Sequence, residues 1–487
     1  MDLDVLVVGA GISGINAAYR IQSQFPNTRY AVLEARSSVG GTWDLFRYPG
    51  IRSDSDLFTF GFPWNPWNQP QPIAEGSAIL QYIKQSAAQT GVDQHIRFHH
   101  QVTAADWSSE HQRWTLSVEL QRPQQQPQQL QLTTRFLVWS TGYYNYHQPL
   151  PADIPGLERF QGQTIHPQFW PEQLDYRGKK IVIIGSGATA VTLLPTLAQQ
   201  AAHTTMLQRS PTYIVSVPNG SARAWYSRWL PDGLYRRWKR YSWILTARLF
   251  FLVCQTFPGF MKRALRRRAS EQLPARIPVD PHFTPRYNPW DQRVCFSPDG
   301  DFYQSLRDGT ADVKTDTIRQ VVGHGIELAS GETLPADIII TATGLQLEMS
   351  GAARVAVDGR PIHPPDHYVW RSMMLNDVPN SVFIIGYTNA SWTLGADATA
   401  RFICRLLHLL RARRASSVVP RLDGPVQPVR LMNLQSTYMT RAESALPKAG
   451  DRAPWRPRES YYADSLFVDY GDVTGALEFC PEHPKSE

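Results

Sequence analysis

The chain has 487 residues, of which 42% are apolar, so we expect two or three domains with full hydrophobic cores and not a disordered protein. Its four cysteines lie too far apart for a C-x-x-C motif, which excludes a redox dithiol or zinc site of that kind, and we expect no metal site. The net charge of +7 comes from one segment, residues 223–268, so a nucleic-acid-binding protein is not expected.

The chain begins with the pattern of a dinucleotide-binding unit. The apolar residues 5–8 lead directly into Gly9-Ala-Gly11-Ile-Ser13-Gly14, and a helix is expected to follow. In this context glycines let the backbone approach a pyrophosphate, which then faces the positive end of the helix. Because no basic leader precedes the strand, we expect no signal peptide and a cytoplasmic protein.

Glu34 indicates which nucleotide this first unit binds. It ends the second apolar strand, residues 30–33, and stands 25 positions after Gly9. A carboxylate there accepts hydrogen bonds from ribose hydroxyls and repels a 2′-phosphate. The first site is therefore predicted to bind FAD or NAD.

A second motif lies between the first glycine motif and the next one. Residues 114–120 and 130–138 are expected to form strands joined by a glutamine- and proline-rich surface loop, residues 121–129. After them comes a run that fits F-x-G-x-x-x-H-x-x-x-W, whose fixed positions are Phe160, Gly162, His166 and Trp170.

The second glycine motif follows the apolar strand 181–184 and consists of Gly185-Ser-Gly187-Ala188-Thr189-Ala190. The position that corresponds to Glu34 is Arg209, next to Ser210, and a guanidinium there suits a 2′-phosphate. The second site is therefore predicted to bind NADPH. A bound flavin and a diffusible NADPH, with hydride transfer between them, explain two sites of unlike preference.

Residues 223–268 carry twelve Lys or Arg and one acid, which gives this segment a charge of +11 and leaves the rest of the chain at −4. Within it Leu234, Trp238, Tyr241, Leu245 and Leu249 have the spacing of an apolar stripe on a helix. We favour a helical insertion that packs over a substrate cleft with its charge in solvent. The alternative is peripheral contact with an anionic membrane surface, because the longest apolar run, residues 249–254, is too short to span one.

We predict an α/β fold with two Rossmann-like dinucleotide-binding domains, for FAD and NADP, and a helical insertion in the NADP domain. A strand at 382–386 and a helix at 398–410 are expected to return to the first domain. The predicted domains are a FAD-binding part at 1–149, an NADP-binding part at 150–212, the helical insertion at 213–290, a second NADP-binding part at 291–345 and a second FAD-binding part at 346–487.

Six motifs together carry a family resemblance over roughly residues 3–460. The chain resembles the flavin-dependent Baeyer–Villiger monooxygenases, and within them the ethionamide monooxygenase subgroup, which oxidises ketones and thioamide sulfur. The motifs are Gly40-Gly41-Thr42-Trp43, Arg47 to Asp56, Phe160 to Trp170, Asn288 to Arg293, Ala342 to Gly344 and Gly386 to Thr393.

The resemblance implies an NADPH- and O2-dependent enzyme that converts a ketone into an ester or lactone through a C4a-peroxyflavin, with sulfoxidation as a side activity. It implies that Arg293 is the catalytic cation that stabilises this peroxide and the oxyanion, and that Asp54 orients it. Asp56 is two residues away and either carboxylate could serve, while Arg52 is the next candidate cation. The fingerprint residues, His166 among them, are implied to coordinate the two domains and not to act as a base.

The resemblance and the glycine motifs together imply a set of cofactor-binding residues. One departure concerns the position before Arg293, where many family members have lysine and this chain has Gln292, so Arg209 is expected to carry more of the 2′-phosphate selectivity, helped by Gln208, Ser210 or Thr212. The implied residues are Gly9, Gly11, Ser13, Gly14, Glu34, Arg36, Gly41, Thr42, Trp43, Asp54, Gly185, Gly187, Ala188, Thr189, Ala190, Arg209, Ser210, Asn389 and Trp392.

Two other functions are compatible with the same predicted nucleotide sites. One is a flavin-containing monooxygenase that oxidises only sulfur or nitrogen, and the other is a flavin-binding protein that docks on membranes without oxygenating a substrate. Substrates of the favoured enzyme are molecular oxygen and a small ketone, sulfide or thioamide.

Overall fold

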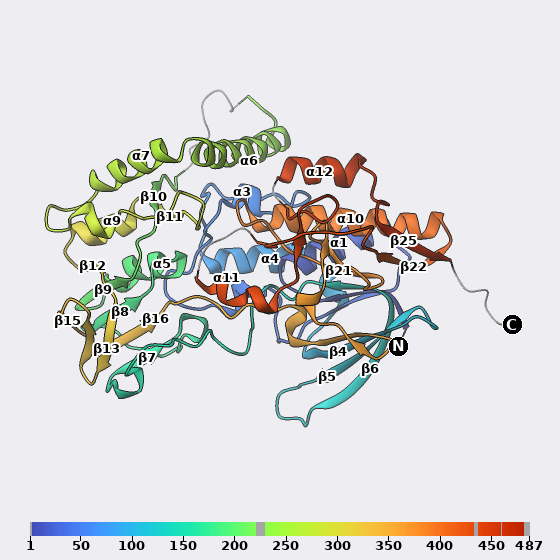
Figure 1. The fold of residues 1–487 in the computed structure, drawn as a ribbon, viewed down its shortest axis with the longest axis horizontal. Helices are drawn as coiled ribbons and strands as arrows, with labels where there is room; N and C mark the ends of the chain where they lie inside the picture. Colours follow the sequence, from blue (N-terminus) through green and yellow to red (C-terminus); the bar gives the residue numbers. More distant parts are fainter. Residues whose placement is uncertain (1, 221–228, 433–436, 459, 482–487) are drawn as a thin grey trace.

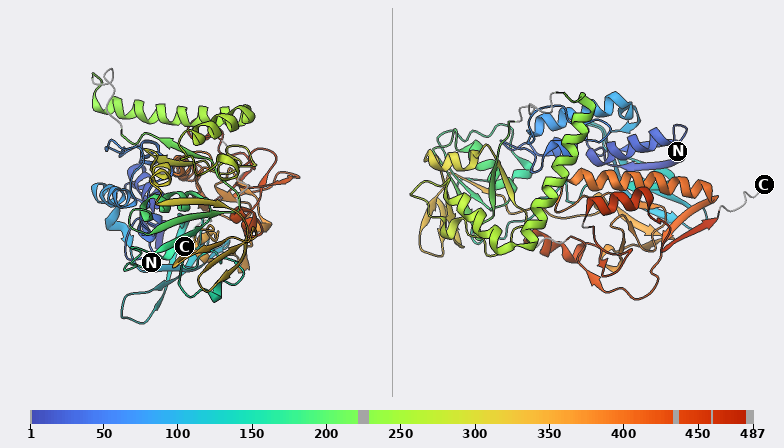
Figure 2. Two further views of the ribbon diagram at one scale, coloured as in Figure 1. Left: turned by 90° about the vertical axis from the view of Figure 1, so that its left-hand side faces the viewer. Right: turned by 90° about the horizontal axis from the view of Figure 1, so that it is seen from above.

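The computed structural model describes residues 2–220, 229–432, 437–458 and 460–481. These residues form two α/β units that lie side by side, each built around one sheet (Figure 1). The long helix α6 (Asp232–Thr256) and helix α7 (Pro258–Ser270) lie along one outer side of both units (Figures 1 and 2). The predicted α/β class with a helical insertion is therefore confirmed.

The first sheet has the strand order β18-β17-β4-β5-β6-β1-β2-β3, and β21 also pairs with β6. Strand β1 lies between β2 and β6 and is parallel to both, so that Val8 stands opposite Leu33 on one side and Trp139 on the other. Its strands are β1 (Asp2–Val8), β2 (Tyr30–Leu33), β3 (Ile96–Arg97), β4 (His100–Ser108), β5 (Arg113–Leu120), β6 (Gln128–Trp139), β17 (Arg354–Val357), β18 (Arg360–Pro361) and β21 (Ser381–Phe383).

From Val5 to Val8 both faces of β1 are buried, which explains why this part of the strand is an apolar run and does not alternate with polar residues. Val5 and Val7 pack against α1 (Ile12–Gln24), α4 (Gly76–Thr90) and α10 (Trp392–Ala412). Leu6 packs on the other face with Trp107 and Trp114. Helix α10 was predicted at 398–410, but it begins at Trp392, inside the sixth sequence motif.

The second sheet is parallel throughout and has the order β12-β9-β8-β16-β7. One face packs on α5 (Ala188–Leu197) and α9 (Asp301–Arg307), and the other on the small sheet β13-β14-β15. These strands are β7 (Gln163–Ile165), β8 (Lys180–Ile184), β9 (His203–Gln208), β12 (Ala311–Thr315), β13 (Ile318–Val322), β14 (Gly325–Leu328), β15 (Thr333–Pro335) and β16 (Ile338–Thr341).

The helical insertion leaves and rejoins the second unit through a pair of parallel strands, β10 (Ile214–Val217) and β11 (Cys295–Pro298). Arg223, where the basic segment of the sequence begins, lies outside the described residues. The remaining elements include α2 (Thr42–Leu45), α3 (Leu57–Phe60), α8 (Val279–His282), α11 (Thr437–Ala442), α12 (Tyr461–Tyr470), β19 (Val369–Trp370), β20 (Met374–Leu375), β22 (Ala415–Pro420), β23 (Pro428–Val429), β24 (Ala449–Gly450) and β25 (Leu477–Pro481).

Two linkers connect the units, and they run antiparallel to each other. Tyr144 bridges to Leu347, and Asn145 N donates to Gln346 O at 2.8 Å. The Asn145 side chain also donates from Nδ2 to Glu348 Oε2 at 2.6 Å. These contacts fix one unit against the other at the point where the chain crosses between them.

Candidate active site

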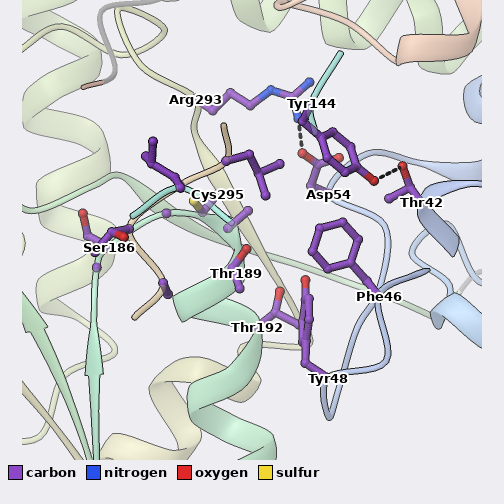
Figure 3. Close-up of a pocket in the computed structure, with 18 of the residues that line it drawn as sticks. Thr42, Phe46, Tyr48, Asp54, Tyr144, Ser186, Thr189, Thr192, Arg293 and Cys295 are labelled. Atoms are coloured by element: carbon purple, nitrogen blue, oxygen red, sulfur yellow. Dashed lines mark hydrogen bonds and ion pairs between the residues drawn. The ribbon is translucent and has the colours of Figure 1, made fainter. Parts of the chain in front are cut away.

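A cavity of about 770 Å³ lies between the two units and is lined by residues of both glycine motifs. Gly11 comes from the turn after β1, and Gly187 comes from the turn after β8. The N-termini of α1 and α5 therefore open into the same space (Figure 3 shows the α5 side).

The first turn is shaped for close backbone approach. Gly9 has φ +101°, and a Cβ on it would lie 2.5 Å from Ser140 O. Gly11 is the N-cap of α1, where no side chain caps the helix and the first turn holds no acid. Ser13 lines the cavity beside it and accepts a 3.3 Å hydrogen bond from Trp392 Nε1. An uncapped helix N-terminus without an acid fits a pyrophosphate.

Glu34 supports this turn from behind. Its Oε2 accepts from Ala10 N at 2.7 Å, and its Oε1 accepts from Arg36 N at 2.9 Å. Burial raises the pKa of Glu34, and these two backbone hydrogen bonds act against that rise. Glu34 and Arg36 are not among the residues that line the cavity, and the Arg36 guanidinium pairs with Asp44.

The second turn repeats the arrangement. Gly185 has φ +136°, and a Cβ on it would lie 2.3 Å from Ala342 O. Gly187 is the uncapped N-cap of α5, and a Cβ there would meet no atom within 4 Å, so it would only fill the cavity. Ala188 and Thr189 also line the cavity. This open cradle fits a second phosphate-bearing ligand.

Three predicted residues shape the turns without lining the cavity. These are Gly9, Gly14 and Ala190. Ala190 is buried in the core of the second unit, and a Cβ on Gly14 would lie 1.9 Å from Gly9 O.

Arg209 and Ser210 line the cavity directly after β9, as a 2′-phosphate site requires. Thr212 lines it as well. The expectation that Gln208 helps them is not met in the structure, because its side chain points into the second unit. Its Nε2 donates to His282 O at 2.7 Å and to Thr315 Oγ1 at 2.9 Å.

Arg293 forms an ion pair with Asp54 at the cavity wall, and both side chains remain partly exposed (Figure 3). Asp56, the alternative carboxylate, is instead the N-cap of α3 and accepts from Thr59 N at 2.8 Å. Arg52 also lines the cavity, but its guanidinium pairs with Asp301. The structure thus brings together two predicted residues that stand 239 positions apart in the sequence, one from each unit.

Aromatic residues that the sequence argument did not single out form the wall next to this pair. Tyr144 and Tyr146 stack with ring centroids 4.8 Å apart, and the Tyr144 hydroxyl lies 2.8 Å from Thr42 Oγ1 (Figure 3). Burial raises the pKa of Tyr144 well above its ordinary value, so its hydroxyl stays protonated. Their place directly after Ser140-Thr-Gly142 was the available signal.

Gly41, Thr42, Trp43 and Trp392 also line the cavity, and the Trp392 ring packs on Tyr143. Asn389 is not among the lining residues. Arg441 of α11 is a further lining cation that the sequence argument missed, because nothing near it forms a motif.

The fingerprint residues do not line the cavity. His166 Nδ1 accepts from Gln168 N at 3.2 Å and caps a short 3-10 helix, and burial lowers the pKa of His166. Gln168 is buried and its Nε2 donates to Asn145 O at 2.6 Å, which ties the fingerprint to the first linker. Phe160 and Trp170 pack against the cores on the two faces of the second sheet.

Comparison with known proteins agrees with this geometry. Residues 59–226 match the model of flavin-binding monooxygenase-like proteins, and residues 7–70 match NAD(P)-binding Rossmann-like domains. The chain is 46% identical over 473 residues to the FAD-containing monooxygenase EthA of Mycolicibacterium smegmatis, covering 96% of this chain and 95% of that protein. It is 42% identical over 468 residues to the probable FAD-binding monooxygenase AlmA of Acinetobacter baylyi, covering 95% and 93%.

Solved structures show the same fold at low sequence identity. The ε-caprolactone-bound structure of cyclohexanone monooxygenase has a TM-score of 0.78 at 17% identity, covering 98% of this chain and 99% of that chain. The complex of OTEMO with FAD and NADP has a TM-score of 0.73 at 19% identity, also covering 98% and 99%. The chain therefore belongs to the FAD-containing monooxygenases of the EthA type and has the Baeyer–Villiger monooxygenase fold.

Proposed function

We propose that the protein is an NADPH- and O2-dependent Baeyer–Villiger monooxygenase that inserts one oxygen atom beside a ketone carbonyl to give an ester or lactone. We include sulfoxidation of sulfides or thioamides as a side activity. The observation that carries the proposal is the Arg293–Asp54 ion pair in the wall of a cavity that two glycine turns share.

The first turn, together with Gly41, Thr42 and Trp43, would hold FAD, and the second turn with Arg209 would hold NADPH. Bound FAD, reduced by hydride from NADPH, would supply the activation of oxygen. Glu34 has a second lone pair on each carboxylate oxygen with which to accept from a ribose hydroxyl, although both oxygens already accept a backbone hydrogen bond. Arg209 is a forked cation at the position where a 2′-phosphate would need one.

Arg293 would stabilise the negative charge that develops on oxygen during the reaction. A fixed cation is most effective for this in a site from which water is excluded, because little reorganisation is then needed. Asp54 would hold the guanidinium in place as a positioning residue. The aromatic wall of Phe46, Tyr48 and Tyr144 would exclude water, since these side chains are buried against the second unit.

The test is a product screen with isotopically labelled O2, using a set of ketones of varied length, a sulfide and a thioamide. We expect one labelled oxygen atom in each ester or lactone, and a smaller yield of labelled sulfoxide. Sulfoxides without any ester would identify an enzyme that oxidises heteroatoms only. Binding of FAD without an oxygenated product from any compound would contradict both functions.

A further inference from the structure

The outer face of helix α6 carries large apolar side chains in solvent. Each of these side chains is at least 40% exposed, and they are spaced by three or four positions, so they form one stripe along the helix. We call this set the α6 stripe, and its members are Leu234, Trp238, Tyr241, Leu245, Leu249 and Leu252.

The α6 stripe faces solvent because the opposite side of α6 packs on the first unit. Ile244 packs with Tyr387 and Leu394 of the first unit. Arg240 is buried and its Nη1 donates to Phe58 O at 3.0 Å and to Gly61 O at 2.7 Å. The helix thus turns a cation inward and its apolar stripe outward, which is the reverse of a helix on the surface of an ordinary globular protein.

Cations border the stripe. Arg237 and Arg248 lie on α6 beside it, and the following helix α7 carries the exposed Arg263 and Arg268, together with Arg266, which also pairs with Asp280. Phe257 and Phe260, at the start of α7, are further exposed apolar side chains. From residue 229 to residue 270 the single acid is Asp232, at the first turn of α6.

We propose that the α6 stripe and the start of α7 dock on the surface of an anionic phospholipid bilayer, with the apolar side chains among the headgroups and the arginines on lipid phosphates. An apolar strip flanked by arginines complements such a surface in both hydrophobicity and charge. The exposed stripe runs the length of one helix, which is the kind of contiguous apolar surface that soluble proteins keep covered.

Helix α6 would lie along the bilayer and not cross it. Among the described residues no single helix has the length and apolar character of a membrane span, although α6 and α7 together do, across a bend of 113°. Crossing would detach Arg240 from its two carbonyl partners and leave a charge in hydrocarbon. Since Phe58 follows Asp54 closely in the chain, the docking face lies over the segment that holds the ion pair, as the position of α6 above α3 shows (Figure 1).

The experiment is flotation of the purified flavin-loaded enzyme with vesicles of phosphatidylcholine alone and of phosphatidylcholine mixed with phosphatidylglycerol. We expect flotation with the anionic vesicles, weakening as salt is raised, because screening reduces the attraction of arginine to lipid phosphate. Combined Trp238→Gln, Leu245→Gln and Leu249→Gln should lower the partition coefficient by at least about tenfold. Arg237→Gln and Arg248→Gln should each lower it by about fivefold.

The matched control is Leu422→Gln with Val429→Gln, which removes two exposed apolar side chains outside α6 and α7 and should leave flotation unchanged. Flavin content and ketone oxidation in solution report folding of every variant, because no substituted side chain lines the cavity. The proposal is wrong if the wild-type enzyme stays unbound with anionic vesicles, or if the triple variant floats as well as the wild type. It is also wrong if the triple substitution converts a stable dimer into a monomer without any change in vesicle binding, since a second copy would then be the partner.

Discussion

Arg293 pairs with the carboxylate of Asp54 at the cavity wall, and its backbone carbonyl accepts a 3.5 Å hydrogen bond from Thr212 Oγ1. The pair is partly exposed, so its contribution to the free energy of folding is expected to be small. What the pair provides is a cation in a fixed direction, and its loss should therefore affect turnover much more than stability.

We expect Arg293→Ala to retain FAD, because the first glycine turn is held by Glu34 through Ala10 N, and to form ester about 100- to 1,000-fold more slowly. Asp54→Ala should be milder, since the cation remains. The matched control is Arg47→Ala, which removes an exposed pair with Glu172 outside the cavity and should leave the rate unchanged. Flavin content, anaerobic reduction by NADPH and ester formed per NADPH are measured for each variant. A normal ester rate in Arg293→Ala would move the catalytic role to another cation, with Arg52 the next candidate.

Arg209→Ala should weaken NADPH binding by about 1 to 3 kcal/mol, the usual loss for a charged hydrogen bond, and leave NADH binding nearly unchanged. The neighbouring Gln208 does not replace the lost contact to the 2′-phosphate, because its side chain is bonded to His282 and Thr315 inside the second unit. The apparent affinities are read from the concentration dependence of flavin reduction. Equal losses for NADPH and NADH would show that Arg209 does not contact the 2′-phosphate.

At the scale of the elements, Gly185 and Gly187 of the second turn are required for different physical reasons. Gly185 needs its positive φ, whereas Gly187 has φ −77° and ψ −178°, an extended conformation that any residue adopts, with open space around a Cβ. Substitution at Gly187 should therefore separate ligand binding from folding.

Gly187→Asp should leave the stability of the protein within a few tenths of a kcal/mol, because aspartate is a good N-cap. It should weaken NADPH at least about tenfold, since its carboxylate would repel the pyrophosphate. Gly185→Ala, by contrast, should lower the melting temperature, because its Cβ would collide with Ala342 O. Thermal unfolding and NADPH affinity are measured for both variants. Unchanged NADPH affinity in Gly187→Asp would remove the N-terminus of α5 from the proposed site.

The central strands could be predicted from the sequence because burial on both faces makes them apolar runs next to glycine turns, as β1 and β8 are. The direction of the α6 stripe could not, because helical spacing shows that a stripe exists but not whether it faces the core or solvent. Our favoured interpretation, an insertion packed over the cleft, fits the inner face of α6, where Arg240 and Ile244 lie, but it does not account for the exposed stripe.

At the scale of the whole molecule, the site depends on contacts far apart in the sequence. The residues of the Arg293–Asp54 pair stand 239 positions apart, and only the family resemblance linked them beforehand. Tyr144 was missed because its place after Ser140-Thr-Gly142 was its one signal, and that signal does not say which of the following side chains reach the cavity. The same linker that carries Tyr144 also sets how the two units face each other, through Asn145.

Asn145 joins three segments. Its Nδ2 donates to Glu348 Oε2 in the second linker, its Oδ1 accepts from His147 N and Gln148 N, and its carbonyl accepts from Gln168 of the fingerprint. Burial raises the pKa of Glu348, and the hydrogen bond from Asn145 acts against that rise. Loss of Asn145 is therefore expected to raise the pKa of Glu348 further.

Asn145→Ala should loosen the second unit against the first, because it removes the side-chain tie between the linkers and leaves Glu348 without this partner. We expect normal FAD content, since both glycine turns are unchanged, and a lower yield of ester per NADPH consumed, with the difference appearing as hydrogen peroxide. Glu348→Gln is the matched control, because an amide oxygen still accepts from Asn145 Nδ2. The yield of ester per NADPH consumed should therefore stay near that of the wild type. Ester, NADPH and peroxide are measured in the same reaction. If Asn145→Ala forms as much ester per NADPH consumed as the wild type, the hydrogen bond between the linkers does not position the two units for catalysis.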